Sequence, residues 1–516
     1  MNYKPAKVFS AAPSGLGAQL VEVEADVSVG LHSFQIVGLP DKSVEEAKER
    51  ISSALKNFKF KHPRSFNKRV VINLAPADIK KEGVLYDLPI ALSFLIASGQ
   101  AKFDASNYIF VGELNLEGSL RPVKNCLSFS LLAKEKNIKY LVVPKDNQKE
   151  AGLVEGVNIV AISNLLDLIM FLENPQEYRP KSLDAVPVST QEPATQNIID
   201  MASINGQQNA KRALEIAASG GHNIMMQGPP GSGKTVLAQA FAGILPDMTN
   251  EEKIEVTQIY SLLGKIDPQS PLIKRRPFRN PHHSSSSSAL IGGGPSLKPG
   301  EITLAHRGVL FMDEFPEFRR DVLEALRQPM ESGYISVARA RGEVLFPARF
   351  ILVAAANPCP CGFYNDPEKS CQCFGSQLQR YIRKLSGPIA DRIDIHVQVP
   401  HQKYEILTAQ TNSERSLDIQ KRVESARRAQ SIRFKESKSS LCNADMSIEE
   451  IKKFCEIPPG SKQILQKAVD KDRLSARGYH KVLKLSRTIA DLAAEEKIAS
   501  QHVLEAISYN STITRD

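Results

Sequence analysis

The hydrophobic pattern of the first third of the chain indicates short strands separated by helices. Residues 20–27 alternate apolar and polar side chains, which predicts a strand buried on one face. Apolar runs at 34–38, 69–74 and 139–143 predict three further strands.

Two helices are predicted between these strands. Apolar side chains recur at intervals of three or four from residue 44 to 55, after Asp41, so we expect a helix with Ser43 as its N-cap. The run at 88–97 predicts a second helix. Alternating strands and helices predict a compact α/β domain over residues 1–172.

The pattern changes twice along the rest of the chain. Residues 173–198 combine four prolines with Ser, Thr and Gln and have little apolar periodicity, which predicts a linker. A helical pattern then leads into a short apolar strand at 223–226, and α/β character continues over residues 199–400. Helical patterns rich in basic residues predict an all-α lid over residues 401–516.

The composition limits the class of protein without selecting a function. The 516 residues suffice for about three domains, and 42% hydrophobic with 24% charged residues is typical of a globular chain. A net charge of +9 permits nucleic-acid binding but does not require it. No apolar run approaches the ~18–20 residues of a membrane span, and the first ten residues lack the features of a secretory signal. We therefore expect a cytoplasmic protein with no membrane segment.

A glycine-rich segment directly follows the strand predicted at 223–226. It matches the complete P-loop pattern with Gly228, Pro229, Pro230, Gly231, Ser232, Gly233, Lys234 and Thr235. The glycines allow backbone N–H groups to face phosphate oxygens, Lys234 can reach the β and γ phosphates, and the Thr235 hydroxyl can hold Mg²⁺. A helix is predicted to follow, and its N-terminus favours an anion. This segment predicts ATP and Mg²⁺ as cofactors.

Two later apolar strands end in polar residues that suit ATP hydrolysis. The run at 308–312 precedes Asp313, which could support Mg²⁺, and Glu314, which could polarise the attacking water. The run at 350–356 ends at Asn357, whose amide could orient the same water against the γ phosphate. An acidic turn, or an Asn that begins a turn, would explain these residues without catalysis. The P-loop upstream favours the ATPase interpretation.

Four of the seven cysteines form a compact CxC–x9–CxC group, made of Cys359, Cys361, Cys371 and Cys373. Four thiolates in so short a span can close tetrahedrally on Zn²⁺, so a structural zinc site is favoured. Redox or iron–sulfur chemistry and unligated thiols are the alternatives. The other three, Cys126, Cys442 and Cys455, are expected in helices or in the core.

Two segments of the expected ATPase core carry cations that could hold a nucleic-acid backbone. The first, 275–300, combines a serine run and a glycine triplet with Arg275, Arg276, Arg279, His282 and His283. Small, flexible and cationic residues suit phosphate tracking without base reading, and a surface loop is the alternative. Adjacent histidines point apart on a strand, which disfavours a metal site.

The second segment, 334–346, alternates, turns and alternates again, which predicts a hairpin with Arg339 and Arg341 at its tip. A solvated hairpin tip without a ligand is the alternative.

The order of P-loop, Asp-Glu strand end and Asn strand end resembles the AAA+ ATPases. The segment 387–394 resembles the arginine-finger segment of the magnesium-chelatase and minichromosome-maintenance branch, which implies that Arg392 reaches a neighbouring subunit's γ phosphate. The segment 474–478 resembles the sensor-two helix of that branch, which implies a second γ-phosphate contact for Arg477. Surface salt bridges are the alternative for both arginines. By the same resemblance, both cationic segments are pore insertions.

The whole chain resembles the ComM/YifB group of magnesium-chelatase-like proteins. The residues that carry this resemblance lie at 34–41, 279–284 and 357–362. The resemblance implies a homo-hexameric DNA helicase, with single-stranded or branched DNA and recombination proteins as partners. It also implies ATP-driven branch migration of recombination intermediates and a role in natural transformation.

Residues 1–172 resemble the proteolytic fold of Lon. In that comparison Asp87 stands at the position of the nucleophilic serine, and the position of the dyad lysine falls near Leu127. Peptide hydrolysis by a Ser–Lys dyad needs both groups, so we expect a non-proteolytic scaffold.

Three classes of function therefore compete. A DNA motor is favoured by the cationic segments and by the ComM/YifB resemblance. A magnesium-chelatase-like chaperone, acting on a protein or metal-insertion partner, shares the ATPase core but normally requires an integrin-like domain, which is not recognisable here. An ATP-dependent protease is disfavoured by the missing dyad.

Overall fold

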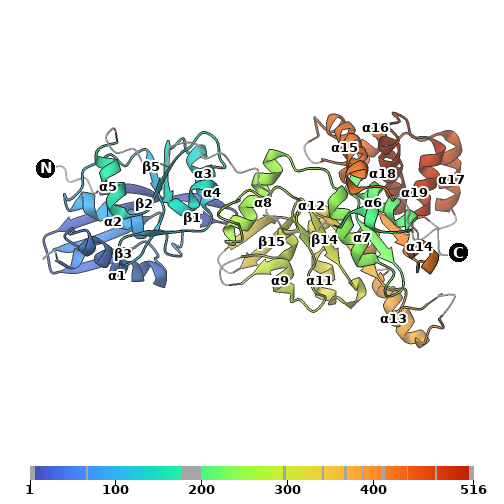
Figure 1. The fold of residues 1–516 in the computed structure, drawn as a ribbon, viewed down its shortest axis with the longest axis horizontal. Helices are drawn as coiled ribbons and strands as arrows, with labels where there is room; N and C mark the ends of the chain where they lie inside the picture. The colour runs from blue at the N-terminus through green and yellow to red at the C-terminus, as the bar shows by residue number, and fades with distance from the viewer. Residues whose placement is uncertain are drawn as a thin grey trace. The chain divides into compact units, whose positions relative to one another are not determined.

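A computed structural model describes residues 6–65, 68–175, 199–294, 298–339, 342–364, 369–385, 389–408, 413–437, 440–470 and 474–510. They form two compact units. The first unit holds the described residues up to 175 together with 250–273, and the second holds 199–249 and those from 274 onward. Figure 1 shows mixed helices and strands followed by a helical C-terminal region in orange and red, which confirms the predicted fold class.

The first unit is built on a mixed seven-stranded sheet with the order β3-β4-β2-β1-β5-β8-β9. Its strands are β1 Ala6–Ser14, β2 Gly17–Ser28, β3 Ser33–Val37, β4 Arg69–Ala75, β5 Tyr108–Phe110, β8 Tyr140–Pro144 and β9 Asn158–Ile162. A separate hairpin pairs β6 Glu113–Leu114 with β7 Leu120–Arg121. The four strands predicted from the hydrophobic pattern are all present, within a few residues of the expected bounds.

The helices of the first unit are α1 Lys42–Asn57, α2 Asp87–Ala97, α3 Cys126–Glu135, α4 Gln148–Ala151, α5 Leu165–Glu173 and α8 Asn250–Leu262. The prediction that Ser43 caps α1 is wrong. Asp41 is extended at the N-cap, and its carboxylate accepts the Val44 N–H at 2.8 Å, whereas Ser43 already lies in the first turn. The segment 250–273, which the sequence places within the ATPase core, belongs to this unit.

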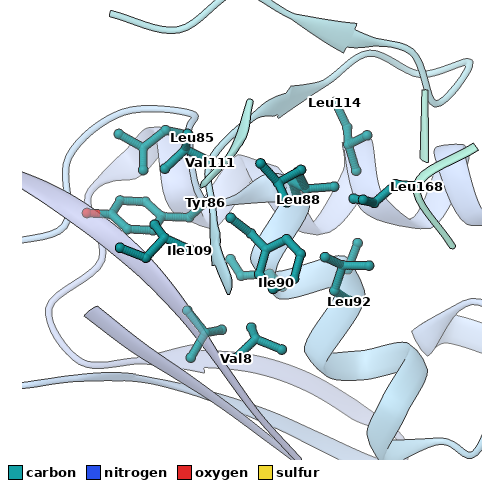
Figure 2. Packing of buried hydrophobic residues seen from close by; sticks show 14 of the residues in the cluster. Val8, Leu85, Tyr86, Leu88, Ile90, Leu92, Ile109, Val111, Leu114 and Leu168 are labelled. Carbon is teal, nitrogen blue, oxygen red and sulfur yellow. The ribbon is translucent and has the colours of Figure 1, made fainter. Parts of the chain in front are cut away.

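The core of the first unit surrounds α2, which is apolar on nearly all sides. Leu88, Ile90 and Leu92 are fully buried, and Figure 2 shows them packed among side chains of the sheet such as Val8 and Ile109. A helix without a polar face is stable only inside a core, so α2 anchors the unit.

The two positions compared with the Lon dyad make structural contacts. The Asp87 carboxylate, 1% exposed, accepts hydrogen bonds from Arg50 Nε at 2.6 Å and Arg50 Nη2 at 2.8 Å. It also accepts the Leu114 N–H at 3.2 Å. Leu127 is buried, and its N–H donates to Glu150 Oε1 at 3.0 Å. Asp87 and Leu127 are therefore fixed within the core by polar contacts.

The second unit begins with a five-stranded parallel sheet in the order β11-β14-β17-β10-β18. The strands are β10 Ile224–Gln227, β11 Phe278–Arg279, β14 Val309–Met312, β17 Ile351–Ala356 and β18 Ile395–Gln398. Its helices are α6 Gln208–Gly220, α7 Lys234–Phe241, α9 Ser287–Ile291, α10 Glu301–Leu304, α11 Arg320–Ala325, α12 Arg327–Ser332 and α13 Gly375–Leu385.

Two antiparallel pairs accompany this sheet. β15 Tyr334–Arg339 pairs with β16 Gly342–Pro347, which confirms the predicted hairpin, and β12 Gly292–Gly293 pairs with β13 Lys298–Pro299.

The C-terminal part of the second unit is helical, as predicted. Its helices are α14 Tyr404–Thr408, α15 Ser416–Arg433, α16 Ile448–Phe454, α17 Pro459–Asp470, α18 Ala476–Leu492 and α19 Ser500–Ser508. None of the helices in the described part of the chain is long and apolar enough to cross a membrane.

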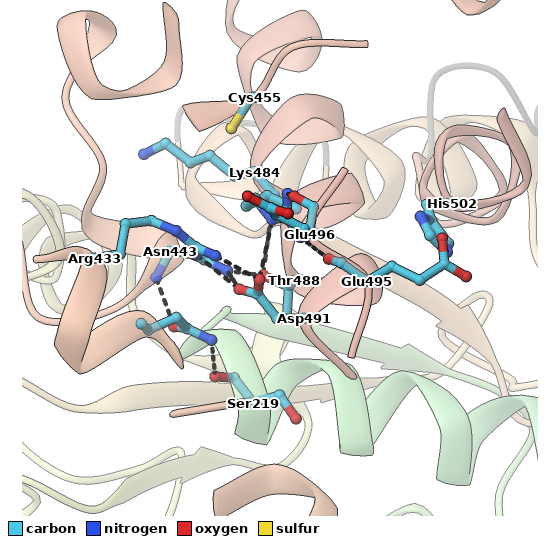
Figure 3. A network of polar contacts seen from close by, with 12 residues as sticks. Ser219, Arg433, Asn443, Cys455, Lys484, Thr488, Asp491, Glu495, Glu496 and His502 are labelled. Carbon is cyan, nitrogen blue, oxygen red and sulfur yellow. Dashed lines mark hydrogen bonds and ion pairs between the residues drawn. The ribbon is translucent and has the colours of Figure 1, made fainter. Parts of the chain in front are cut away.

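A buried carboxylate joins the helices of this region. Asp491 on α18 accepts hydrogen bonds from Arg433 at 2.6 and 2.8 Å, from Arg487 at 3.0 Å and from Asn443 at 2.8 Å. Figure 3 shows this network, which continues toward Ser219 on α6. The Asp491 side chain is only 2% exposed, so water cannot replace these partners. The charge-assisted hydrogen bonds from the two arginines therefore hold Asp491 in place.

We expect Asp491→Ala to lower the free energy of unfolding of the helical region by about 3–5 kcal/mol, because two arginines are left without their buried partner. Urea unfolding of the full chain, followed by circular dichroism, measures the change. The control is Asp418→Ala, which removes the exposed pairs with Arg415 and Lys421 and should cost less than about 1 kcal/mol. Equal effects of the two substitutions would contradict the assignment.

Candidate nucleotide-binding site

The P-loop lies at the carboxyl end of β10, between the neighbouring strands β17 and β18. Gly231 and Gly233 have φ angles of +76° and +93°, in the region where glycine is favoured. A Cβ at Gly228 would overlap the backbone of Val399, so this turn also has no room for a side chain. α7, predicted to follow the P-loop, begins at Lys234, so the lysine stands on the first helical turn.

Lys234 is 7% exposed, and its ammonium group has acceptors in the P-loop and at the end of β17. Its Nζ donates to Gly228 O at 2.7 Å, to Pro229 O at 2.9 Å and to Asn357 Oδ1 at 3.2 Å. Burial lowers the pKa of Lys234, and the charge of Asp313 opposes that shift. A phosphate would offer this ammonium a stronger, charged acceptor in place of neutral carbonyls.

The ends of β10, β14 and β17 bring the other predicted residues to the same place, because these strands are neighbours in a parallel sheet. Thr235 Oγ1 donates to Asp313 Oδ2 at 2.9 Å. A hydroxyl beside a carboxylate can hold a divalent cation through oxygen ligands, as Mg²⁺ prefers. Together with Lys234 and Asn357, the pair forms one cluster of polar groups.

Glu314 lies beside this cluster in an unusual backbone conformation. Its φ is +50°, which is uncommon for a residue with a side chain and often marks a functional site. The carboxylate is half exposed, and its Oε2 lies 3.0 Å from His283 Nδ1. The His283 ring also lies against the His282 ring in a tilted arrangement, with ring centroids 4.2 Å apart. No sequence pattern predicts the contact between His283 and Glu314.

Arg392 and Arg477 converge on a single carboxylate. Arg477 Nη2 lies 3.0 Å from Glu331 Oε1, and Arg392 Nη2 pairs with the same oxygen. Partial burial would raise the pKa of Glu331, but the hydrogen bonds from Arg477 and Arg392 outweigh it and lower that pKa. The structure therefore brings the two arginines together on one carboxylate. Glu331 belongs to no recognised motif, so sequence reasoning missed it.

The predicted DNA-contacting cations have different surroundings. Arg276 donates to Pro246 O at 2.6 Å and to Arg307 O at 2.7 Å, and Arg279 forms a two-point ion pair with Glu301 at 2.6 and 2.8 Å. Arg275 is exposed.

The remaining candidates are His282, His283, Arg339 and Arg341. His282 Nδ1 lies 2.7 Å from Ser284 Oγ. Arg341 and the side chain of Arg339 lie outside the described residues.

The four clustered cysteines converge as predicted. The Sγ atoms of Cys359, Cys361, Cys371 and Cys373 all lie within 4.8 Å of one another. A set made only of thiols suits a soft or borderline ion such as Zn²⁺ and does not suit Mg²⁺ or Ca²⁺. The remaining cysteines, Cys126, Cys442 and Cys455, are buried, as expected.

Backbone amides make one of the four thiols, that of Cys361, more acidic. The N–H groups of Phe363 and Gln372 lower the pKa of Cys361 to about 6. Burial raises the pKa of Cys359 to about 12.

Comparison with protein families agrees with this arrangement. A model described as magnesium chelatase, subunit ChlI, matches residues 200–407. Models described as subunit ChlI of Mg-chelatase and as the C-terminal part of that subunit match residues 23–147 and 413–510.

Individual relatives match over nearly the full length. Competence protein ComM of Haemophilus influenzae is 44% identical over 98% of this chain and 97% of its own. The uncharacterized protein YifB of Escherichia coli is 41% identical over 98% and 96%. A magnesium-chelatase subunit ChlI of Trieres chinensis is 27% identical over 31% and 52%. The chain therefore belongs to the ComM/YifB family of magnesium-chelatase-like AAA+ ATPases.

Proposed function

We propose that this chain is an ATP-driven motor that works as a homo-hexameric ring on single-stranded or branched DNA. Its action is the branch migration of recombination intermediates, as in natural transformation, in the cytoplasm and alongside recombination proteins. One observation carries the ATPase part of the proposal. Lys234, Thr235, Asp313 and Asn357 meet at the ends of three neighbouring parallel strands. Similarity to Competence protein ComM over nearly the whole chain supports the DNA part.

The residues of the cluster have different roles in ATP hydrolysis. The backbone N–H groups of the P-loop and Lys234 hold the phosphates, and Thr235 with Asp313 supports Mg²⁺. Bound Mg²⁺ supplies positive charge against the phosphate oxygens. Glu314 takes the proton of the attacking water on a carboxylate oxygen, and Asn357 orients that water.

Arg392 and Arg477 serve a γ phosphate at the boundary with a neighbouring subunit. Their pairing with Glu331 supports this role, because it leaves two guanidinium groups side by side with one anion between them. Cations at that point stabilise the charge that develops in phosphoryl transfer.

The DNA-contacting surface is proposed to lie on the two cationic segments, with Arg275, Arg276, Arg279, His282, His283, Arg339 and Arg341 as its candidates. Arg275 is exposed, and Arg339 is the last residue of β15. Phosphate contacts give affinity without sequence preference, which suits a motor that moves along DNA.

The domain boundaries along the sequence are proposed at 1–172, 173–198, 199–400 and 401–516, with residues 250–273 packing in the first unit. The first domain is proposed as a non-proteolytic, Lon-like scaffold. The contacts of Asp87 and Leu127 support that role, since both positions are engaged in the core.

The four cysteines are proposed to hold one structural Zn²⁺. The alternative for the whole protein is a magnesium-chelatase-like chaperone for a protein or metal-insertion partner. Family models named for magnesium chelatase, which match most of the chain, favour that alternative.

The first prediction from the proposed function concerns hydrolysis. Lys234→Ala should abolish binding of a fluorescent ATP analogue, because a phosphate-binding cation is removed. Glu314→Gln should bind the analogue but release phosphate about 10²–10⁴ times more slowly, as expected when a general base is removed. If Glu314→Gln turns over ATP at the wild-type rate, the role assigned to Glu314 is wrong.

The second prediction concerns DNA. Replacing Arg339 and Arg341 together by Ala should flatten the salt dependence of DNA affinity by up to about two units, because each arginine neutralises one phosphate. The double variant should fail to migrate a four-way junction but keep its basal ATPase rate. The control replaces the exposed Arg319 and Arg320, which removes the same charge. A hairpin variant that migrates the junction as fast as wild type would exclude the hairpin from the motor.

The third prediction concerns the metal. Elemental analysis should find about one zinc per chain, because four thiolates complete a tetrahedral site. Cys371→Ser should lose the metal, whereas Cys455→Ala, which removes a buried thiol outside the group, should keep it. A metal-free wild-type preparation that is folded and active would rule out the zinc site.

A further inference from the structure

The four-cysteine loop lies directly against the P-loop. Gly362, which follows Cys361, has a φ of +87°. A Cβ built on Gly362 would come 2.7 Å from Cγ of Pro230 and closer still to its Cδ. Since real Cβ atoms essentially never approach below 3.0 Å, the backbone of Gly362 packs against the Pro230 ring with no space for a side chain.

The same loop is attached to the nucleotide site at its beginning. It starts at Asn357, whose Oδ1 accepts from Lys234 Nζ at 3.2 Å. The backbone oxygen of Asn357 accepts the O–H of the buried Tyr381 on α13 at 3.1 Å. Lys384, also on α13, donates to Pro316 O at 2.6 Å, just after Glu314. The chain on both sides of the cysteines is therefore bonded to groups around the P-loop.

Inside the loop, the cysteines set the position of Gly362. Cys359 is fully buried, and its backbone oxygen accepts the Gly362 N–H at 3.0 Å. Cys361 Sγ lies 3.6 Å from Cys371 Sγ, so the turn that contains Gly362 is held against the second cysteine pair. A metal bound to all four thiolates would fix this turn, because it crosslinks the two ends of the loop.

We propose that the four-cysteine loop positions the P-loop through the packing of Gly362 on Pro230, so that metal binding at the thiols strengthens ATP binding. This inference rests on the proposed ATPase function and adds a regulator to its nucleotide site. A P-loop held in its binding conformation before ATP arrives gives up less freedom on binding, which raises affinity. Without the metal the turn relaxes, Gly362 withdraws from Pro230, and the P-loop is no longer supported there.

The test measures the dissociation constant of a fluorescent ATP analogue with full-length protein, together with metal content. Gly362→Ala should retain its zinc and weaken binding roughly tenfold, the scale of effect when a residue that supports a site from outside is changed. The control is Gly375→Ala at the start of α13, where a Cβ meets nothing within 4 Å, and it should bind like wild type. Pro230→Ala should also weaken binding, and adding it to Gly362→Ala should change the affinity little further, because both substitutions disrupt the same contact.

A second arm removes the metal from wild-type protein with a chelator. The dissociation constant should rise roughly tenfold, the same scale as for Gly362→Ala, and return on addition of Zn²⁺. The inference is overturned if Gly362→Ala binds the analogue as tightly as wild type, or if metal-free protein does. Wild-type protein that never binds the analogue would instead refute the proposed ATPase function.

Discussion

The parallel arrangement of β10, β14 and β17 determines where the chemistry of this chain can occur. Neighbouring parallel strands end at the same edge, so the P-loop, the Asp-Glu pair and Asn357 must meet there. Two hydrogen bonds hold these segments together: Thr235 donates to Asp313, and Lys234 donates to Asn357. The four-cysteine loop and α13 are attached to this edge through the backbone around Asn357. A change in the register of β17 would therefore displace the cysteines and the catalytic candidates together.

Residues that act through local spacing could be predicted from the sequence. The P-loop, the strands that end in polar residues, the hairpin and the convergence of four thiols all follow from short-range patterns. Contacts between distant segments could not be predicted in this way. Glu331 carries no motif, and its role depends on which arginines fold next to it. The packing of Gly362 on Pro230 likewise depends on how two loops meet, which no periodicity records.

In the N-terminal unit, too, some features could be predicted from the sequence and others could not. Its strands follow from alternating side chains, but the sequence pattern places the N-cap of α1 two residues late, because both Asp41 and Ser43 suit that position and only Asp41 has the extended backbone. The inclusion of 250–273 in this unit does not follow from the pattern either. The apolar pattern of α8 would be the same whether the helix packed in the first unit or in the second. The two units are therefore joined by more chain passages than a single linker provides.

The proposed function requires that ATP hydrolysis by the chain is coupled to DNA. The most direct test is the steady-state ATPase rate of the wild-type protein with and without a four-way junction, at low and at high salt. The junction should accelerate hydrolysis, and salt should remove the acceleration, because a motor that holds DNA by its phosphates loses affinity as salt rises. An active ATPase whose rate is the same with and without single-stranded or branched DNA at every salt concentration would contradict the proposed function.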